Sequence, residues 1–290
     1  MIDMSNYVIL TDSSADLVPE IIASPDLYYI QLDVIVEGEE ARANCDVDIK
    51  EFYAKLREKK NATTNAANIE RFITEMEKHL SLGKDVLYLG FSSGLSGTYN
   101  AGFVAAKELA DKYPDRKIYT VDTLAASLGE GLLVYLAVKK MEDGATIDEV
   151  RDFVEENKLR MAHWFTVDDL FFLKRGGRVS AATAVVGSML SIKPVMHMDN
   201  AGKLIKVTTA RGRKASIDAL FAKMQETAID PENQVVFISH GDSAEDAEYL
   251  AERIRNELGV KDIKISYVGP VIGAHSGPGT IALFFIATER

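Results

Sequence analysis

Short hydrophobic runs alternate with segments of helical periodicity along the first half of this chain. The runs Tyr7–Leu10, Leu27–Val36, Val86–Phe91 and Lys117–Val121 carry β-branched and aromatic residues, and each predicts a buried strand. Strands that alternate with helices indicate a doubly wound, mainly parallel sheet. Ligands of such sheets bind beyond the carboxyl ends of the strands.

Hydrophobic residues at spacings of three and four predict the helices between these strands. The segment Lys60–Asn68 is polar and small and has no periodicity, so we expect a loop there. Ser14 or Asp16 is the candidate cap of the first helix. The expected helices begin near Pro19, at Asp48, at Asn68 and after Thr98, one more runs from the segment around Ser127 to about Asp143, and another spans Thr146–Lys158.

The pattern changes near residue 160, where we expect a boundary between a domain of residues 1–160 and a domain of residues 161–290. The second domain is expected to be α/β and to contain a β-hairpin around the turn DNAG at 199–202. Its expected strands are Met161–Val167, Ile192–Met198, Lys203–Ala210, Val235–Ser239, Lys264–Val268 and Ile281–Ala287, and its expected helices are Ser180–Leu190, Ser216–Ala228 and one that a capping box at Ser243 opens and that ends at Leu258.

Charge and composition exclude several classes of function. The 290 residues carry a formal net charge of −11 without a long basic run, which argues against nucleic acid and against broad electrostatic binding to anionic lipid. The single cysteine, Cys45, fits a reducing compartment. The sequence has no signal-peptide pattern and no long apolar stretch, so we expect a cytoplasmic protein.

The segment from Ser92 to Thr98 carries the strongest signal of a binding site. It holds three serines, one threonine and two glycines at a predicted strand-to-helix junction. Free backbone amides, hydroxyl donors and the positive end of a helix dipole suit a carboxylate or phosphate there without a Lys or Arg. The alternative is that Ser96 or Thr98 merely caps the helix.

Four further groups are candidates for the same site. Thr63 and Thr64 lie beside a predicted helix start, although a solvated loop explains them equally well. Ser127, Gly129 and Gly131 occupy the start of another helix, where glycines cost stability unless a ligand or backbone approaches closely. A Gly/Pro-framed loop at 269–279 holds His275 and Ser276, and a basic tip contains Lys174, Arg175 and Arg178, for which helix-dipole compensation is the alternative.

Four motifs together resemble the DegV family of bacterial fatty-acid-binding proteins. They are TDSSADL at 11–17, SSGLSGTY at 92–99, DDL with LKRGGRVS within 168–180, and GPVIGAHSGPG at 269–279. The resemblance runs in order over essentially the whole chain. It implies two α/β domains that bury a long-chain fatty acid between them, with no other cofactor and no metal. It also implies that some members present the acid to a partner kinase that makes acyl phosphate, and it leaves room for a transient encounter with a membrane.

The resemblance also implies a set of site residues. In the family the carboxylate is held by a threonine of a TSQP-like loop, a serine of the SSxLSG motif and the histidine of the last motif, which correspond here to Thr64, Ser93 and His275. This chain has Asn65, Ala66 and Ala67 where the family has Ser-Gln-Pro. The expected supporting residues are Thr63, Ser92, Ser96, Gly97, Ser127, Gly129, Ser276 and Gly277, and the expected kinase-docking residues are Lys174, Arg175 and Arg178.

The competing hypothesis is a serine hydrolase that acts on a lipid ester. The sequence GFSSG at 90–94 fits the Gly-x-Ser-x-Gly pattern between a strand and a helix. The pattern is short, and no His-Gly-Gly-Gly oxyanion motif accompanies it. A nucleotide-binding enzyme is less well supported, because no phosphate-binding loop of the Gly-x-x-x-x-Gly-Lys type is present. The hydrolase residues would be Ser92 or Ser93, Asp122 or Asp242, and His275.

Overall fold

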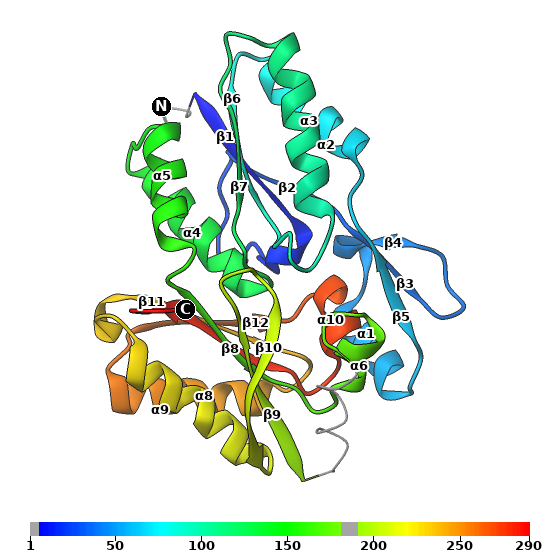
Figure 1. Ribbon diagram of the computed structural model, residues 1–290, viewed down its shortest axis with the longest axis vertical. Helices are drawn as coiled ribbons and strands as arrows, with labels where there is room; N and C mark the ends of the chain where they lie inside the picture. The colour runs from blue at the N-terminus through cyan, green and yellow to red at the C-terminus, as the bar shows by residue number, and fades with distance from the viewer. Residues whose placement is uncertain (1–5, 181–190) are drawn as a thin grey trace.

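The computed structural model describes residues 6–180 and 191–290, whose strands form three sheets (Figure 1). The parallel sheet has the order β2-β1-β6-β7, and every neighbouring pair in it is parallel. The predicted parallel sheet of the first half is therefore confirmed. Its strands are β1 (Tyr7–Asp12), β2 (Leu27–Ile30), β6 (Asp85–Gly90) and β7 (Ile118–Asp122).

Helices cover both faces of the parallel sheet, because its strands are hydrophobic on both. Val8 and Leu10 face one side with Phe72 of α2, whereas Ile9 faces the other side with Val134 of α4. This alternation follows the two-residue period of a strand. The helices are α2 (Ile69–Leu80) and α3 (Thr98–Lys112) on one face, and α4 (Leu128–Glu142) and α5 (Ile147–Asn157) on the other.

A small antiparallel sheet of order β4-β3-β5 corrects two predictions. The run predicted as one strand over Leu27–Val36 is divided into β2 and β3, which belong to different sheets. The loop expected over Lys60–Asn68 contains a strand, β5. Its polar sequence does not indicate a strand, but β3 supplies partners for its backbone hydrogen bonds. The elements are β3 (Asp33–Val36), β4 (Arg42–Ala43), β5 (Ala62–Asn65), the short helix η2 (Asn44–Asp46) and α1 (Ile49–Arg57).

The remaining strands form a mainly antiparallel sheet of order β10-β9-β8-β13-β11-β12. The predicted hairpin is confirmed as β9 and β10, and helices α8 and α9 cover the outer face of the sheet (Figure 1). The helix expected over Ser180–Leu190 lies, from residue 181 onward, outside the described residues. The elements are β8 (Met161–Thr166), β9 (Ile192–Met198), β10 (Leu204–Arg211), α8 (Arg213–Thr227), η3 (Pro231–Asn233), β11 (Val235–His240), α9 (Ala244–Leu258), β12 (Asp262–Tyr267) and β13 (Ile281–Ile286).

Three local predictions were wrong. No helix begins at Pro19; a single 3₁₀ turn, η1 (Ser13–Ala15), is capped instead by the side chain of Asp12. Ser243 precedes α9 but makes no capping hydrogen bond with its side chain. The expected loop at 269–279 contains a seven-residue helix, α10 (Pro270–Ser276), because Pro270 at its first position needs no amide partner. The predicted helical turn before the double glycine is present as α6 (Phe171–Arg175).

Helix α4 joins the two large sheets. Val134 and Val138 pack on the parallel sheet, whereas Leu128 and Leu132 pack on the inner face of the mainly antiparallel sheet. Figure 1 shows α4 between the two sheets. A boundary near residue 160 stays a prediction. Within residues 6–180 and 191–290, no helix is both long enough and apolar enough to cross a bilayer.

Candidate functional site

A cavity of about 510 Å³ lies between the parallel sheet and the mainly antiparallel sheet. Its upper wall is formed by residues that follow the carboxyl ends of the parallel strands, including Leu32 after β2, Phe91 and Ser93 after β6, and Ala126 after β7. This is the edge at which the sequence predicted a ligand. The volume falls in the range of small-molecule sites.

The floor of the cavity is the inner face of the mainly antiparallel sheet. Phe165 of β8, Ala282 of β13 and Ser239 of β11 stand opposite one another in the sheet register, and all three line the cavity. Residues two positions away along β13 also line it, as the strand period requires. The other floor residues are His163, Met198, Leu204, Thr280 and Phe284.

Thr64 and His275 meet at a polar part of the cavity wall. The Oγ1 atom of Thr64 lies 2.8 Å from Nε2 of His275. A Cβ atom at Gly176 would lie 2.2 Å from Nδ1 of His275, so only glycine lets the chain pass this closely. Burial first, then the nearby cations Arg178 and Arg175, lower the pKa of His275 to about 4. The imidazole is therefore neutral near pH 7.

Arg178 brings a positive charge to the cavity, which the sequence analysis did not foresee. Its side chain lines the cavity wall and donates hydrogen bonds to the carbonyls of Leu95 and Gly176. Burial lowers the pKa of Arg178, but a guanidinium stays charged in proteins. The sequence analysis expected an anion site that needs no Lys or Arg, whereas the cavity that Thr64, Ser93 and His275 line also has a cation in its wall. Nothing in the local sequence distinguishes Arg178 from a surface residue, because the turn through Gly177, at φ +75°, directs it inward.

Ser93 lines the same cavity as Thr64 and His275, from the strand-to-helix junction after β6. Its side chain is exposed, and its amide donates to Oδ1 of Asp122 at 3.2 Å. Ser96 and Gly97 line the cavity as well. Ser96 also accepts a hydrogen bond from the amide of Thr98, so it holds the start of α3 in addition to lining the cavity.

Four of the expected supporting residues lie outside the cavity lining. Thr63 is exposed and precedes Thr64 on β5, so the two side chains point to opposite faces. Ser92 is buried and donates to the carbonyl of Gly202 at 2.8 Å. The other two are glycines that permit close packing, Gly129 against His163 and Gly277 against Phe172.

The described residues show no pairing of Ser92 or Ser93 with His275 of the kind that the hydrolase hypothesis requires. Nε2 of His275 is hydrogen-bonded to Thr64, and Ser92 is hydrogen-bonded to the carbonyl of Gly202. Asp242 pairs with Arg57 at 3.0 Å. Among the described residues, neither serine of the motif is a recorded hydrogen-bond partner of His275. A nucleophile needs such a base within hydrogen-bond reach.

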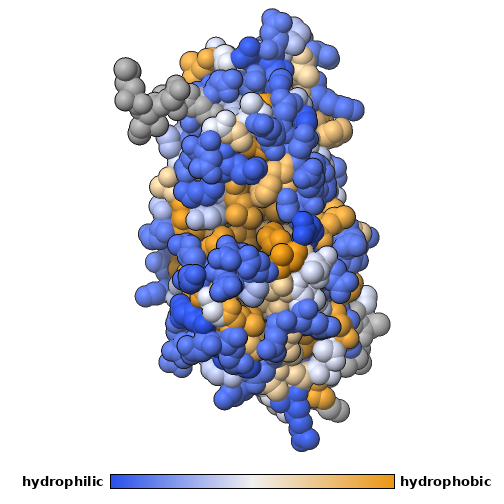
Figure 2. All heavy atoms as spheres, turned by 90° about the vertical axis from the view of Figure 1, so that its left-hand side faces the viewer, coloured by the Kyte–Doolittle hydropathy of each residue, from blue (hydrophilic) through white to orange (hydrophobic). Residues whose placement is uncertain are grey.

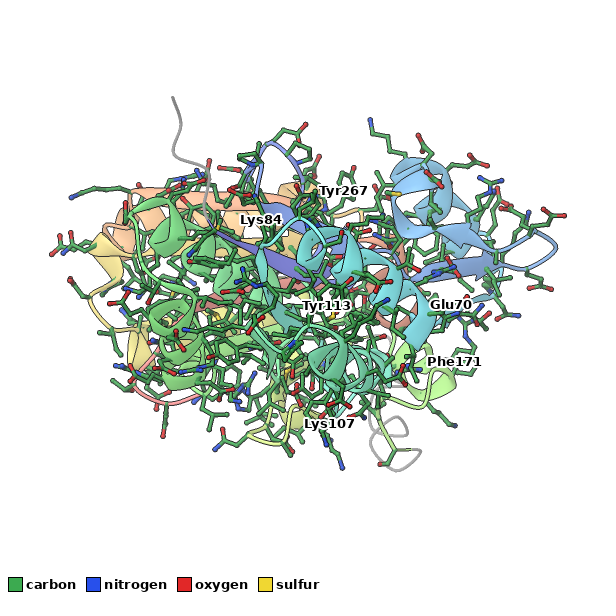
Figure 3. The ribbon with its side chains drawn as sticks, turned by 90° about the horizontal axis from the view of Figure 1, so that it is seen from above. Glu70, Lys84, Lys107, Tyr113, Phe171 and Tyr267 are labelled. Atoms are coloured by element: carbon green, nitrogen blue, oxygen red, sulfur yellow. The ribbon has the colours of Figure 1, made fainter. Side chains whose placement is uncertain are left out.

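The predicted basic tip is divided between the cavity and the surface. Arg178 belongs to the cavity, whereas Lys174 is exposed and Arg175 lies over the ring of Phe172 at 5.0 Å and donates to Asn61. Phe171 is 54% exposed and lies on the same side of the molecule as the small sheet (Figure 3). Among the described residues, the nearby Asp168 pairs with Lys193 at 2.9 Å and with Arg213 at 3.6 Å rather than with a cation of the tip.

The surface near the junction of the sheets is partly apolar. Figure 2 shows hydrophobic colour across the middle of one face, with hydrophilic colour above and below. In the part of the chain that the structure describes, no three His, Cys, Asp or Glu side chains are grouped as a metal site. The fold and site thus define an α/β protein that encloses a mostly apolar cavity with polar and cationic groups in its wall.

Comparison with known proteins assigns this chain to a family. The family model described as "Uncharacterised protein, DegV family" matches residues 6–288, and the chain belongs to the DegV family. A DegV domain-containing protein of Clostridium perfringens is 47% identical over 99% of both chains. A Thermotoga maritima protein described as revealing fatty acid binding function is 32% identical at a TM-score of 0.83, covering 98% of this chain and 100% of its own. A DegV family protein of Thermus thermophilus described by its fatty acid binding is 28% identical at a TM-score of 0.86, with coverages of 98% and 100%.

Proposed function

We propose that this protein binds a long-chain fatty acid in the cavity and holds its carboxylate at Thr64, Ser93 and His275, with Arg178 supplying the counter-charge. The observation that supports this most directly is the Thr64–His275 contact in the wall of a largely apolar cavity that Arg178 also lines. An apolar tail and an anionic head need these two environments together. The solved relatives described as fatty-acid-binding proteins support the same ligand class.

The carboxylate contacts decide whether the protein can take the acid from a membrane. Burial of about 15 methylenes gains ~12 kcal/mol, at ~0.8 kcal/mol each, but a bilayer offers the same gain. Each hydrogen bond to a charged group adds about 1.5–3 kcal/mol. The polar groups in the cavity wall are therefore the part of the site that favours the protein over the bilayer.

Denaturing mass spectrometry of the purified protein tests the ligand class directly. We expect a long-chain fatty acid at up to one molecule per chain. In a displacement assay with a fluorescent fatty acid, Thr64→Val should weaken binding about tenfold, because it removes one hydrogen bond to the carboxylate or to His275. Thr63→Val is the matched control and should bind like wild type. Covalent labelling of Ser92 or Ser93 by a fluorophosphonate, lost in His275→Ala, would instead support the hydrolase.

We further propose that the protein presents the acid to a partner kinase that forms acyl phosphate, as its family resemblance implies. The exposed Phe171 and Lys174 with the half-buried Arg175 form the candidate docking surface. Because two cations on an acidic protein act mainly on association rate, Lys174→Ala with Arg175→Ala should slow phosphorylation at low salt and differ less from wild type at high salt. Lys139→Ala with Lys140→Ala, which removes the same charge from α4, is the control. Equal rates for the two double variants would contradict this docking surface.

A further inference from the structure

Ser127 is held in a backbone conformation that serine rarely adopts. Its φ is +53° and its ψ is −149°, a region populated almost entirely by glycine, and such strain costs about 1–3 kcal/mol. The residue lines the cavity and is 5% exposed. A glycine would relieve the strain, so the hydroxyl is the part of Ser127 that needs an explanation.

The hydroxyl of Ser127 belongs to a chain of polar groups that ends at the cavity floor. Its Oγ donates to Oδ2 of the buried Asp16 at 2.6 Å and lies 3.1 Å from Oγ of Ser239. Ser239 is fully buried and stands on the inner face of β11, opposite Ala282 of β13 and Ser266 of β12. With Ser127 donating to Asp16, Ser239 donates to Ser127, and the lone pairs of Ser239 are left for another partner.

A hydroxyl without a hydrogen-bond partner lines the same cavity. Ser276 is 6% exposed, and among the described residues its Oγ has no hydrogen-bond partner. Buried polar groups in proteins are nearly always hydrogen-bonded, and a tail made only of methylenes would leave Ser276 unpaired and offer nothing to the free lone pairs of Ser239. The cavity thus holds more hydroxyls than the carboxylate site of Thr64, Ser93 and His275 uses.

We infer that Ser127 and Ser239 form a second polar subsite that binds a hydroxyl group on the tail of the ligand. This inference rests on the proposed fatty-acid-binding function. It extends the proposed ligand class to hydroxylated long-chain fatty acids. A hydroxyl both donates and accepts, so it pairs with Ser239 whichever way the hydrogen bonds of the chain run. Asp16 fixes the far end of the chain and positions Ser127.

The test compares stearic acid with a panel of monohydroxystearic acids whose hydroxyl moves along the chain. For wild type, we expect at least one isomer to bind within about threefold of stearic acid. In Ser239→Ala, binding of that isomer should weaken about tenfold more than binding of stearic acid, because the tail hydroxyl then stays unpaired. Ser216→Ala, a buried serine that is bonded to the carbonyl of Arg213 away from the cavity, is the control.

Ser127→Gly separates a loss of binding from a loss of folding. Glycine suits the backbone at this position, so relief of the strain offsets the lost hydrogen bond to Asp16, and the variant should melt close to wild type. It should still bind the hydroxylated isomer about tenfold more weakly, relative to stearic acid, than wild type does. The inference is overturned if the ratio of hydroxystearate to stearate affinity is the same in wild type, Ser239→Ala and Ser127→Gly for every isomer. Failure of stearic acid itself to bind would contradict the proposed function instead.

Discussion

Arg178 and His275 set the charge of the proposed carboxylate site at the scale of single residues. Arg178 supplies a permanent cation, whereas His275 is kept neutral and offers only a hydrogen bond. The site can therefore favour a carboxylate over an uncharged head group of the same size. This division of roles leads to two predictions.

Arg178→Gln should weaken binding of palmitic acid about tenfold or more and leave the corresponding alcohol, hexadecanol, nearly unaffected. The physical reason is that the guanidinium attracts a carboxylate by its charge, with about 1.5–3 kcal/mol for each charge-assisted hydrogen bond, whereas the glutamine amide can still pair with a neutral hydroxyl. Displacement of a fluorescent probe by each ligand measures the difference. Arg175→Gln is the control, and an equal loss for acid and alcohol would show that Arg178 only shapes the cavity wall.

His275 makes the stability of the ligand-free protein depend on pH. Because its pKa falls from 6.5 to about 4 on folding, the unfolded chain binds more protons between these values, and the stability of the folded state decreases as pH falls through this window. The full effect is about 3 kcal/mol. Urea unfolding at pH 7 and pH 4.5 should show this loss in wild type and a smaller loss in His275→Gln. Identical pH dependence of the two proteins would contradict it.

At the scale of elements, α4 must approach the floor of the cavity closely. A Cβ atom at Gly129 would lie 2.1 Å from Nε2 of His163 and 2.7 Å from Phe284, both of which line the cavity. Gly129→Ala should therefore destabilise the protein by about 1–3 kcal/mol and lower its melting temperature by several degrees. Thermal unfolding of delipidated protein tests this. Gly97→Ala, where the new Cβ meets open space, should change far less.

Sequence patterns predicted the elements whose own residues show a clear hydrophobic pattern. The strands β1, β6 and β7 and the hairpin of β9 and β10 lie where periodicity and turn residues placed them. The strand β5 and the helix α10 were missed. The polar sequence of Ala62–Asn65 forms a strand only because it pairs with β3, and the Gly/Pro-rich segment 269–279 by itself predicts a loop. Tertiary partners decide the structure of such segments.

The site was predicted less completely than the fold for a related reason. The hydroxyl-rich junctions at Thr64 and Ser93 could be found because a strand end followed by a helix start has a local signature. Arg178 and Ser239 could not, because their roles depend on a turn through Gly177 and on the sheet register of β11. Neither property can be predicted from the neighbouring residues.

At the scale of the whole molecule, the cavity draws its walls from both large sheets, so an occupant should stabilise both. At a ligand concentration 100 times the dissociation constant, binding adds about 2.7 kcal/mol to the free energy of unfolding. Delipidated protein should therefore melt several degrees lower than protein with added palmitic acid. Butyric acid, which lacks the tail, should have little effect.

Hydrogen exchange locates that stabilisation. On addition of palmitic acid, we expect slower amide exchange both in the segment after β6, around Ser93, and in β13, around Ala282. Exchange in α9, which lies on the outer face of its sheet, serves as the internal reference. Protection confined to one of the two sheets would contradict a ligand held between them.

The position of β13 has a consequence for how the protein is made. This strand, Ile281–Ile286, lies between β8 and β11 although both precede it in the chain by dozens of residues. A nascent chain on the ribosome therefore exposes two open strand edges until residue 286 has emerged, and such edges invite pairing with other chains. The cavity floor is also missing until then. Capture of a ligand can thus begin only after residue 286 has emerged, and a product arrested before that point would be prone to aggregate rather than partly active.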